Sequence, residues 1–256
     1  LAAPVQAQKS KDNLRIAITD MFSVLDPFHF PLDEAGQFYR TTFETLLEFD
    51  ERKQVFVPRL AKSWKRVGPK SLEFVLREDV KFHNGNKFDA TDVKYTFDYL
   101  KDPAVKIRFK GRYSWVDKVE ILGPYKVRVT SKDVFATDLS TIAYRFFIYD
   151  AETHKALDNK SDYGRHASVS TGPYKVVSLD PHKGIVLERF EGYYDKNERF
   201  SKIPKHVHGI PISDQQTQLA QFFTGGVDLL RNVTADSARE LAKLPNAVTT
   251  PIHSGM

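Results

Sequence analysis

Cysteine is absent from the 256 residues of this chain. Its absence excludes disulfides, thiolate metal sites and a cysteine nucleophile, and it removes the residue that a lipoprotein carries at its mature start. Long hydrophobic runs are also missing, because charged residues interrupt every apolar segment well before the ~20 residues that a membrane-spanning helix needs. We therefore predict a soluble protein without a lipid anchor.

A block of charge of one sign is missing too. The chain has 38 basic and 33 acidic residues, for a formal net charge of +5, and the two kinds are interleaved. This pattern is typical of a solvated surface, whereas a nucleic-acid footprint needs basic residues clustered on one face. One basic stretch, residues 106–110, precedes Tyr113 and Trp115. A stacking platform for single-stranded nucleic acid therefore stays open as an alternative to ordinary packing of both rings in the core.

Familiar enzyme signatures are absent. The sequence has no Gly-x-Ser-x-Gly nucleophile elbow, no Gly-rich phosphate loop of the Gly-Lys-Ser/Thr type and no His-Glu-x-x-His zinc helix. Scattered catalytic groups leave a hydrolase as a minor alternative. His206 and His208 lie two apart on a predicted strand, where both rings would share one face, but exposed histidines at a strand edge are the ordinary interpretation. We predict a protein that is not an enzyme and that has no metal site and no cofactor.

Hydrophobic periodicity predicts a mixture of strands and helices. Alternating apolar and polar residues predict strands at residues 14–18, 72–76, 116–121, 125–129, 174–178, 185–190 and 207–210. Helical spacing predicts helices at residues 34–47 and 93–100, two short segments within 135–157, and a helix containing 219–223. The order is neither a strict strand-helix alternation nor runs of one type. It favours a mixed α+β or α/β domain with a subdomain.

Local signals mark where several of these elements begin and end. Asp89 and Asp214 are suited to cap the helices that follow them, because a short acidic side chain accepts hydrogen bonds from the free N–H groups of the first turn. Gly225-Gly226 is expected to stop the second of these helices. The Gly123-Pro124 turn joins the two predicted strands beside it into a hairpin.

Four linked segments resemble one family. They are Arg59–Trp64, Leu72–Arg77, Val80–Gly85 and Phe88–Val93, in that order. Together they resemble the family 5 extracellular solute-binding proteins, which are the oligopeptide, dipeptide and nickel receptors of ABC importers. Further agreement comes from Leu25–Pro27, Phe43–Leu47, Ser170–Tyr174 and Gly226–Leu229. Asp89 stands where the family usually carries threonine, and both residues cap a helix well.

The resemblance implies the fold of a periplasmic binding protein of type II: a mixed α+β lobe with an inserted α+β subdomain, present here as an amino-terminal portion whose second lobe is missing. It assigns residues 13–42 and 166–250 to the first ligand-binding lobe, 43–165 to the inserted subdomain and 251–256 to a truncated hinge strand. Residues 1–12 are expected to be a flexible start with a signal-peptide remnant, since Val5-Gln6-Ala7 has the small-x-small form of a signal-peptidase site.

The function that the resemblance implies is capture of peptides or related small solutes in the periplasm and delivery to the permease subunits of an ABC transporter. Such a receptor is expected to be monomeric at full length, to bind no nucleic acid and to need no cofactor. A haem or metal-chelate receptor of the same family stays open, as does a basic nucleic-acid-binding module of a different class. A portion that holds only one wall of the cleft is expected to bind ligand poorly.

In the resembling family, the loop after the first strand contributes to the ligand clamp. Here the corresponding residues are Phe28, His29, Phe30, Pro31, Leu32 and Asp33. We add Tyr113 and Trp115 as candidate ligand-binding residues. The acidic residues Asp26, Asp33 and Glu34 form a group by this loop that is suited to meet a ligand amine.

Overall fold

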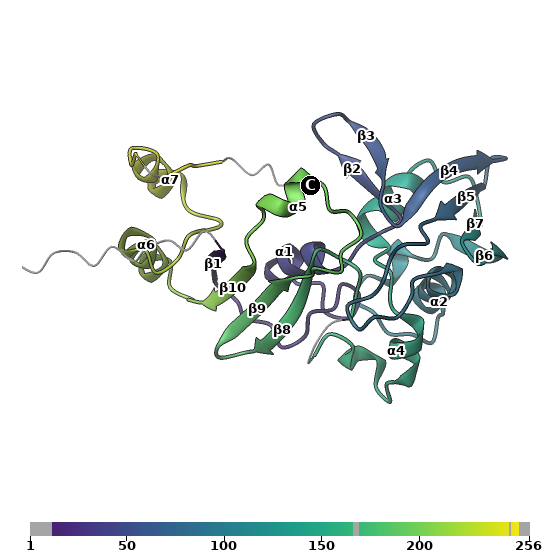
Figure 1. The fold of residues 1–256 in the computed structure, drawn as a ribbon, viewed down its shortest axis with the longest axis horizontal. Helices are drawn as coiled ribbons and strands as arrows, with labels where there is room; N and C mark the ends of the chain where they lie inside the picture. The colour runs from purple at the N-terminus through teal and green to yellow at the C-terminus, as the bar shows by residue number, and fades with distance from the viewer. Residues whose placement is uncertain (1–11, 166–168, 246, 251–256) are drawn as a thin grey trace, which may run out of the picture.

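The computed structural model describes residues 12–165, 169–245 and 247–250 (Figure 1). The strands in these parts are β1 Asn13–Ile18, β2 Leu47–Asp50, β3 Val55–Pro58, β4 Ala61–Val67, β5 Ser71–Leu76, β6 Val116–Gly123, β7 Lys126–Ser131, β8 Tyr174–Asp180, β9 Gly184–Arg189 and β10 His206–Pro211. The α-helices are α1 Asp33–Thr42, α2 Ala90–Lys101, α3 Asp138–Arg145, α4 Ala151–Ala156, α5 Glu198–Lys202, α6 Gln215–Thr224 and α7 Ala235–Leu241. The predicted signal remnant, apart from residue 12, and the predicted hinge strand lie outside the described residues.

The first sheet places the start of the chain beside a segment from near its end. Its strand order is β1-β10-β9-β8, in which β1 is parallel to β10 and the other pairs are antiparallel. Gly209 of β10 lies opposite Ile16, and a Cβ atom there would come within 2.8 Å of Phe38 and 2.3 Å of Ile18. Only glycine therefore lets α1 and β1 pack this closely on β10. Beside β1, the Ala17 N–H donates to the carbonyl oxygen of Leu229 at 3.1 Å, and Ile16 and Leu229 form an isolated parallel bridge.

The second sheet lies at the other end of the molecule in Figure 1 and has the order β4-β5-β7-β6, with all pairs antiparallel. Helix α2 packs on β6 and β7, and α3 packs on the separate β2–β3 hairpin. The predicted strand at 72–76 and the predicted hairpin around Gly123-Pro124 are confirmed as β5 and β6–β7. The predicted division into a lobe and an inserted subdomain stays a prediction.

Helix α2 begins at a capping box. The Asp89 carboxylate accepts a hydrogen bond from the Thr91 N–H at 2.6 Å, and Asp92 accepts one from the Asp89 N–H at 3.0 Å. Each side chain thus satisfies an N–H group that the helix leaves free. Asp214 likewise caps α6, which ends at Gly225 with a left-handed φ of 77°. Both predicted caps and the predicted glycine stop are confirmed.

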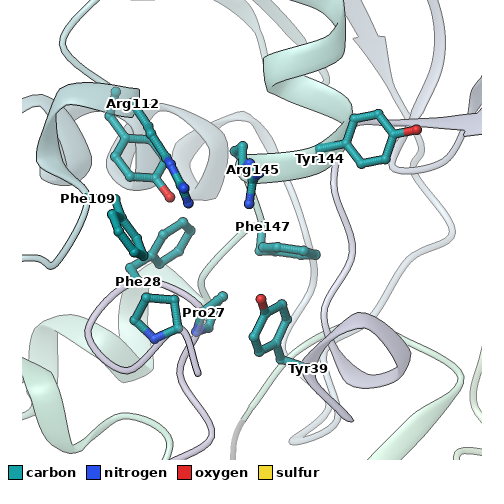
Figure 2. Close-up of a pocket in the computed structure, with 10 residues that line it drawn as sticks. Pro27, Phe28, Tyr39, Phe109, Arg112, Tyr144, Arg145 and Phe147 are labelled. Carbon is teal, nitrogen blue, oxygen red and sulfur yellow. The ribbon is translucent and has the colours of Figure 1, made fainter. Parts of the chain in front are cut away.

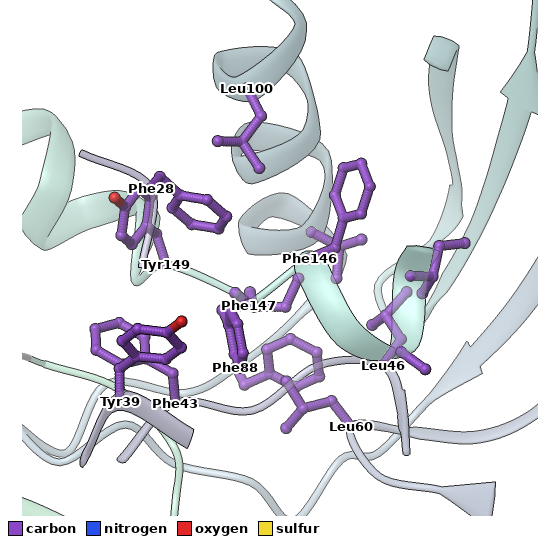
Figure 3. Packing of buried hydrophobic residues seen from close by; sticks show 14 of the residues in the cluster. Phe28, Tyr39, Phe43, Leu46, Leu60, Phe88, Leu100, Phe146, Phe147 and Tyr149 are labelled. Carbon is purple, nitrogen blue, oxygen red and sulfur yellow. The ribbon is translucent and has the colours of Figure 1, made fainter. Parts of the chain in front are cut away.

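One apolar core connects the two sheets, and aromatic rings fill much of it (Figure 3). The rings of Phe97 and Phe146 are stacked with their centroids 4.1 Å apart. Phe147 meets Tyr39 of α1 edge-on at 5.4 Å and Phe43 at 6.5 Å. The segment after α3 therefore ties α1 to α2 through ring contacts.

The predicted helix at 34–47 is wrong at its carboxyl end, because α1 stops at Thr42 and β2 begins at Leu47. Phe43 is extended, with φ −101° and ψ 149°. The carbonyl oxygen of Thr42 accepts hydrogen bonds from the Gly172 N–H at 2.8 Å and from the Ser170 hydroxyl. These partners lie far away in the sequence, so helical spacing alone overextended the helix.

Candidate functional site

The loop between β1 and α1 carries the residues predicted to meet a ligand. Pro27 and Phe28 are buried, Pro31 is half-buried, and Phe30 and Leu32 are exposed. The ring of Phe28 stands edge-on to Tyr149 at 5.1 Å and to Tyr113 at 5.6 Å. The loop is therefore packed against the segments around residues 113 and 149.

A pocket opens beside this loop (Figure 2). Its lining comes from four separate segments of the chain: Pro27, Phe28, Pro31, Tyr39, Phe109, Arg112, Tyr113, Tyr144, Arg145 and Phe147. Figure 2 shows the guanidinium groups of Arg112 and Arg145 pointing into the ring-lined space, whereas Tyr144 points away from it. The pocket thus combines apolar ring faces with two fixed positive charges.

The two arginines differ in how they are held. Arg112 is exposed, and its guanidinium carbon lies 3.9 Å from the centroid of the Phe109 ring, within cation–π distance. Arg145 is half-buried at the end of α3. Among the described residues, neither arginine forms an ion pair with a carboxylate. Both charges are therefore available to an anionic group that enters the pocket.

Tyr113 contributes a neutral hydroxyl to the same wall. Its side chain is almost fully buried, and this burial raises its pKa well above the usual value even though Arg145 and Arg112 lower it. The hydroxyl therefore stays protonated at physiological pH and can donate a hydrogen bond. Together with two guanidinium groups, such a donor suits a carboxylate better than a cation.

The structure brings three of the predicted site residues into this pocket, namely Phe28, Pro31 and Tyr113. His29 turns inward instead, and its Nε2 lies 3.1 Å from the Tyr99 hydroxyl oxygen. Asp33 is exposed at the start of α1.

Trp115 lies outside the pocket lining. Its ring stacks on Phe135 with the centroids 4.9 Å apart, and it packs edge-on to Phe146 at 5.9 Å. Since Tyr113 is 4% exposed and one face of Trp115 is covered, the two rings do not form the open stacking platform that single-stranded nucleic acid needs.

The acidic group predicted near the loop is split into two environments. Asp26 is fully buried and hydrogen-bonded within the loop. Glu34 faces Arg231, with its Oε2 at 3.5 Å from Nη1. Burial raises the pKa of Glu34, and the charge of Arg231 opposes this shift. The three acids therefore do not meet as one amine-binding cluster.

His206 and His208 do share a face of β10, with ring centroids 6.3 Å apart. Across the parts of the chain that the structure describes, no three histidine, aspartate or glutamate side chains are grouped as metal ligands.

Seven of the ten pocket residues were not among the predicted site residues: Pro27, Tyr39, Phe109, Arg112, Tyr144, Arg145 and Phe147. Tyr39, Tyr144, Arg145 and Phe147 could not have been selected by spacing, because they lie far in sequence from the β1–α1 loop that they join in space. The run of basic and aromatic residues at 106–115 was the available signal for Phe109 and Arg112. We interpreted this run as an alternative site for nucleic acid and not as a site for a small anion.

The mixed α/β fold places this chain in the class of periplasmic-type binding proteins. The solved structure of the PBP AgaA from Agrobacterium tumefaciens R10, in complex with agropinic acid, matches 91% of this chain and 46% of its own with a TM-score of 0.82 and 25% identity. The chain belongs to the bacterial extracellular solute-binding proteins, family 5, whose middle region matches residues 55–254. This match confirms the family that the four linked segments of the sequence predicted.

Two curated relatives show how much of the family the chain covers. The glutathione-binding protein GsiB of Pectobacterium atrosepticum is 25% identical over 247 residues, which are 95% of this chain and 46% of GsiB. The uncharacterized protein YhjP of Bacillus subtilis is 31% identical over 221 residues, which are 81% of this chain and 36% of YhjP. The chain therefore spans less than half the length of these relatives. No helix in the described residues is long and apolar enough to cross a membrane.

Proposed function

We propose that this chain provides one wall of the solute-binding site of an ABC importer's receptor, and that the pocket beside the β1–α1 loop binds a small peptide or related solute through a carboxylate. The observation that carries this proposal is the pair of guanidinium groups, Arg112 and Arg145, that point into a ring-lined pocket without carboxylate partners among the described residues. In the importer, the loaded receptor delivers the solute from the periplasm to the permease subunits.

The physical chemistry of the pocket supports a carboxylate-bearing solute. Arginine holds a carboxylate with two parallel hydrogen bonds, and a hydrogen bond to a charged group contributes about 1.5–3 kcal/mol. The nearly buried rings of Phe28 and Phe147 close the base of the pocket, and the exposed Phe109 ring offers apolar area to the rest of the solute. Few polar groups at fixed positions on an apolar wall are typical of a small-molecule site.

The relatives support the same class of solute. GsiB is named for glutathione, a peptide with two carboxylates, and AgaA holds an acid, agropinic acid. Each of these names states what that relative binds and does not identify the solute of this chain. An anionic peptide or amino-acid derivative nevertheless agrees with both names and with the positive charges of this pocket. A metal-chelate receptor remains an outcome of the experiment below.

Isothermal titration calorimetry and thermal shift of the purified chain would test the proposal. The panel contains glutathione, dipeptides and tripeptides, the same peptides with amidated carboxyl ends, and nickel-histidine. We expect free acids to bind and their amides to bind at least about tenfold more weakly, since about 1.4 kcal/mol corresponds to a factor of ten. Because the chain spans less than half of its relatives, we expect weak binding, and ligand concentrations must reach the millimolar range.

Two arginine variants complete the design. Arg145→Ala should reduce affinity for the free acids by about tenfold or more and leave the weak affinity for amides unchanged. Arg52→Ala removes the same charge from an exposed turn outside the pocket and should leave both affinities unchanged. Equal binding of acids and amides, or binding of nickel-histidine alone, would overturn the proposal of a carboxylate site.

A further inference from the structure

Asp26 is the most completely satisfied charged group of the β1–α1 loop. Its side chain is 0% exposed, and Oδ1 accepts hydrogen bonds from the N–H groups of Phe28 and His29, both at 2.8 Å. The Nδ1 of His29 lies 3.3 Å from the same oxygen. Oδ2 accepts a hydrogen bond from the Tyr149 hydroxyl at 2.6 Å. The Asp26 carboxylate thus binds two backbone N–H groups of its own loop and connects the loop to Tyr149 in the segment that follows α3.

The side chains that bond to Asp26, those of His29 and Tyr149, do not line the pocket. His29 continues the network to the Tyr99 hydroxyl of α2 at 3.1 Å. Phe28, whose N–H bonds to Asp26, does line the pocket. Within the loop, next to Asp26, the Leu25 N–H donates to the carbonyl oxygen of Gly164 at 2.7 Å. The position of the Phe28 ring in the pocket wall is therefore set by hydrogen bonds that the solute itself does not touch.

The charge of Asp26 fits this role. Burial disfavours the ionised carboxyl, but the hydrogen bonds from His29 and Tyr149 outweigh burial and hold its pKa below the usual value. An ionised carboxylate makes hydrogen bonds roughly twice as strong as those of a neutral group. Asp26 is therefore ionised at neutral pH.

We infer that Asp26 is the positioning residue of the solute pocket: its buried carboxylate fixes the backbone at Phe28 and His29 and so presents the Phe28 wall to the solute. The effect of Asp26 on solute affinity rests on the proposed function. Its structural consequence, an ordered backbone at residues 28–29, stands independently of any ligand.

A matched aspartate separates positioning from general stability. Asp150 is 1% exposed and caps α4 by accepting from the N–H groups of Glu152 and Thr153 at 3.1 and 3.2 Å. It also accepts from the side chains of Asn84 and Asn86 at 2.8 and 2.9 Å. It is as buried and as fully bonded as Asp26, but it lines no part of the pocket.

The experiment compares Asp26→Ala, Asp26→Asn and Asp150→Ala in the whole chain. Hydrogen exchange measured by mass spectrometry reports the amides of Phe28, His29, Phe30 and Leu32, and calorimetry with glutathione reports affinity. We expect Asp26→Ala to accelerate exchange at Phe28 and His29 by about tenfold or more, since the hydrogen bonds that protect them are to a charged acceptor. Asp26→Asn keeps an oxygen for both amides and should have a smaller effect. Asp150→Ala should leave exchange in this segment unchanged.

The two measurements distinguish the inference from the proposed function. If exchange at residues 28–29 is unchanged in both Asp26 variants, or rises equally in Asp150→Ala, Asp26 is not a positioning residue. Should Asp26→Ala fail to fold, Asp26→Asn is compared with Asp150→Ala, with a smaller expected rise in exchange at residues 28–29. If exchange rises as expected but wild-type protein ignores glutathione and the rest of the panel, the proposed function fails while the positioning role stands. If wild type binds glutathione and Asp26→Ala binds it about tenfold more weakly, both are supported.

Discussion

Glu44 is a buried carboxyl whose ionisation should make the stability of this protein depend on pH. It lies between α1 and β2, where its Oε1 accepts hydrogen bonds from the hydroxyls of Tyr193 at 2.7 Å and Tyr194 at 2.9 Å. Its Oε2 is buried and has no hydrogen-bond partner among the described residues. Burial raises the pKa of Glu44 from 4.5 to about 7, although the two tyrosines lower it.

The direction of the pH effect on stability depends on whether the folded or the unfolded protein holds the Glu44 proton. Between pH 4.5 and about pH 7 the folded protein keeps the Glu44 proton, whereas the unfolded chain releases it. The stabilisation is therefore fully present below pH 4.5 and is lost as pH rises through 7. One pKa unit corresponds to 1.36 kcal/mol, so the free energy of unfolding should fall by up to about 3 kcal/mol across this window.

Glu44→Gln removes this titration and keeps the shape of the side chain. In urea denaturation we expect the variant to match wild type within about 1 kcal/mol near pH 4.5 and to be up to about 3 kcal/mol more stable near pH 8. Asp92, whose pKa burial also raises to about 7, is present in both proteins and cancels in the difference.

Glu73→Gln is the control for the removal of a carboxylate. Hydrogen bonds from Arg128 and Lys126 lower the pKa of Glu73 to about 2, so its titration lies below the pH window of the experiment. Its effect on stability should be the same from pH 5 to pH 8. The interpretation of Glu44 is refuted if the difference between wild type and Glu44→Gln is likewise constant from pH 4.5 to pH 8.

Two further predictions concern the sequence signals that shape the fold, and urea denaturation measures both. Asp89→Ala should destabilise the protein by about 1 kcal/mol through loss of the α2 cap, whereas Asp89→Thr keeps a capping oxygen and should cost much less; equal losses would contradict the capping role. Gly184→Ala should cost more than about 2 kcal/mol, because φ is +106° and the new Cβ would lie 2.0 Å from the Gly209 carbonyl oxygen. Gly68→Ala, with φ +70° and open space around it, should show only the backbone cost of about 1 kcal/mol, and a loss as large as that at Gly184 would contradict the steric part of the reasoning.

Elements specified by local chemistry were predicted from the sequence. The strands β1 and β5 alternate cleanly, and the β6–β7 hairpin has a Gly123-Pro124 turn between two apolar strands. The caps at Asp89 and Asp214 need only the residues within one helical turn. In each case the interactions that decide the structure lie within a few positions of one another, so a single sequence contains them.

Elements that depend on distant partners were missed. The strands β2, β3 and β4 are short or carry charged residues at many positions, so they lack an apolar alternation. Their pairing is set by the sheet that they join. The end of α1 depends on the hydrogen bonds that Thr42 accepts from Gly172 and Ser170. Helices α5 and α7 have only five and seven residues, which is too short for a clear helical period.

The pocket contains both buried residues of the apolar core and exposed residues. Its floor, formed by Phe28, Tyr113 and Phe147, is less than 10% exposed and belongs to the apolar core. A substitution in the floor therefore changes folding and binding together, since a core ring that is removed leaves a cavity that costs several kcal/mol.

The rim behaves differently. Phe109 is 37% exposed, Arg112 is exposed and Arg145 is half-buried, and these three residues can change without leaving a hole in the core. Under the proposed function, charge and shape at the rim select among solutes while the fold stays intact. Substitutions at Arg112 and Arg145 are therefore the ones expected to change which solute binds and to leave the fold unchanged.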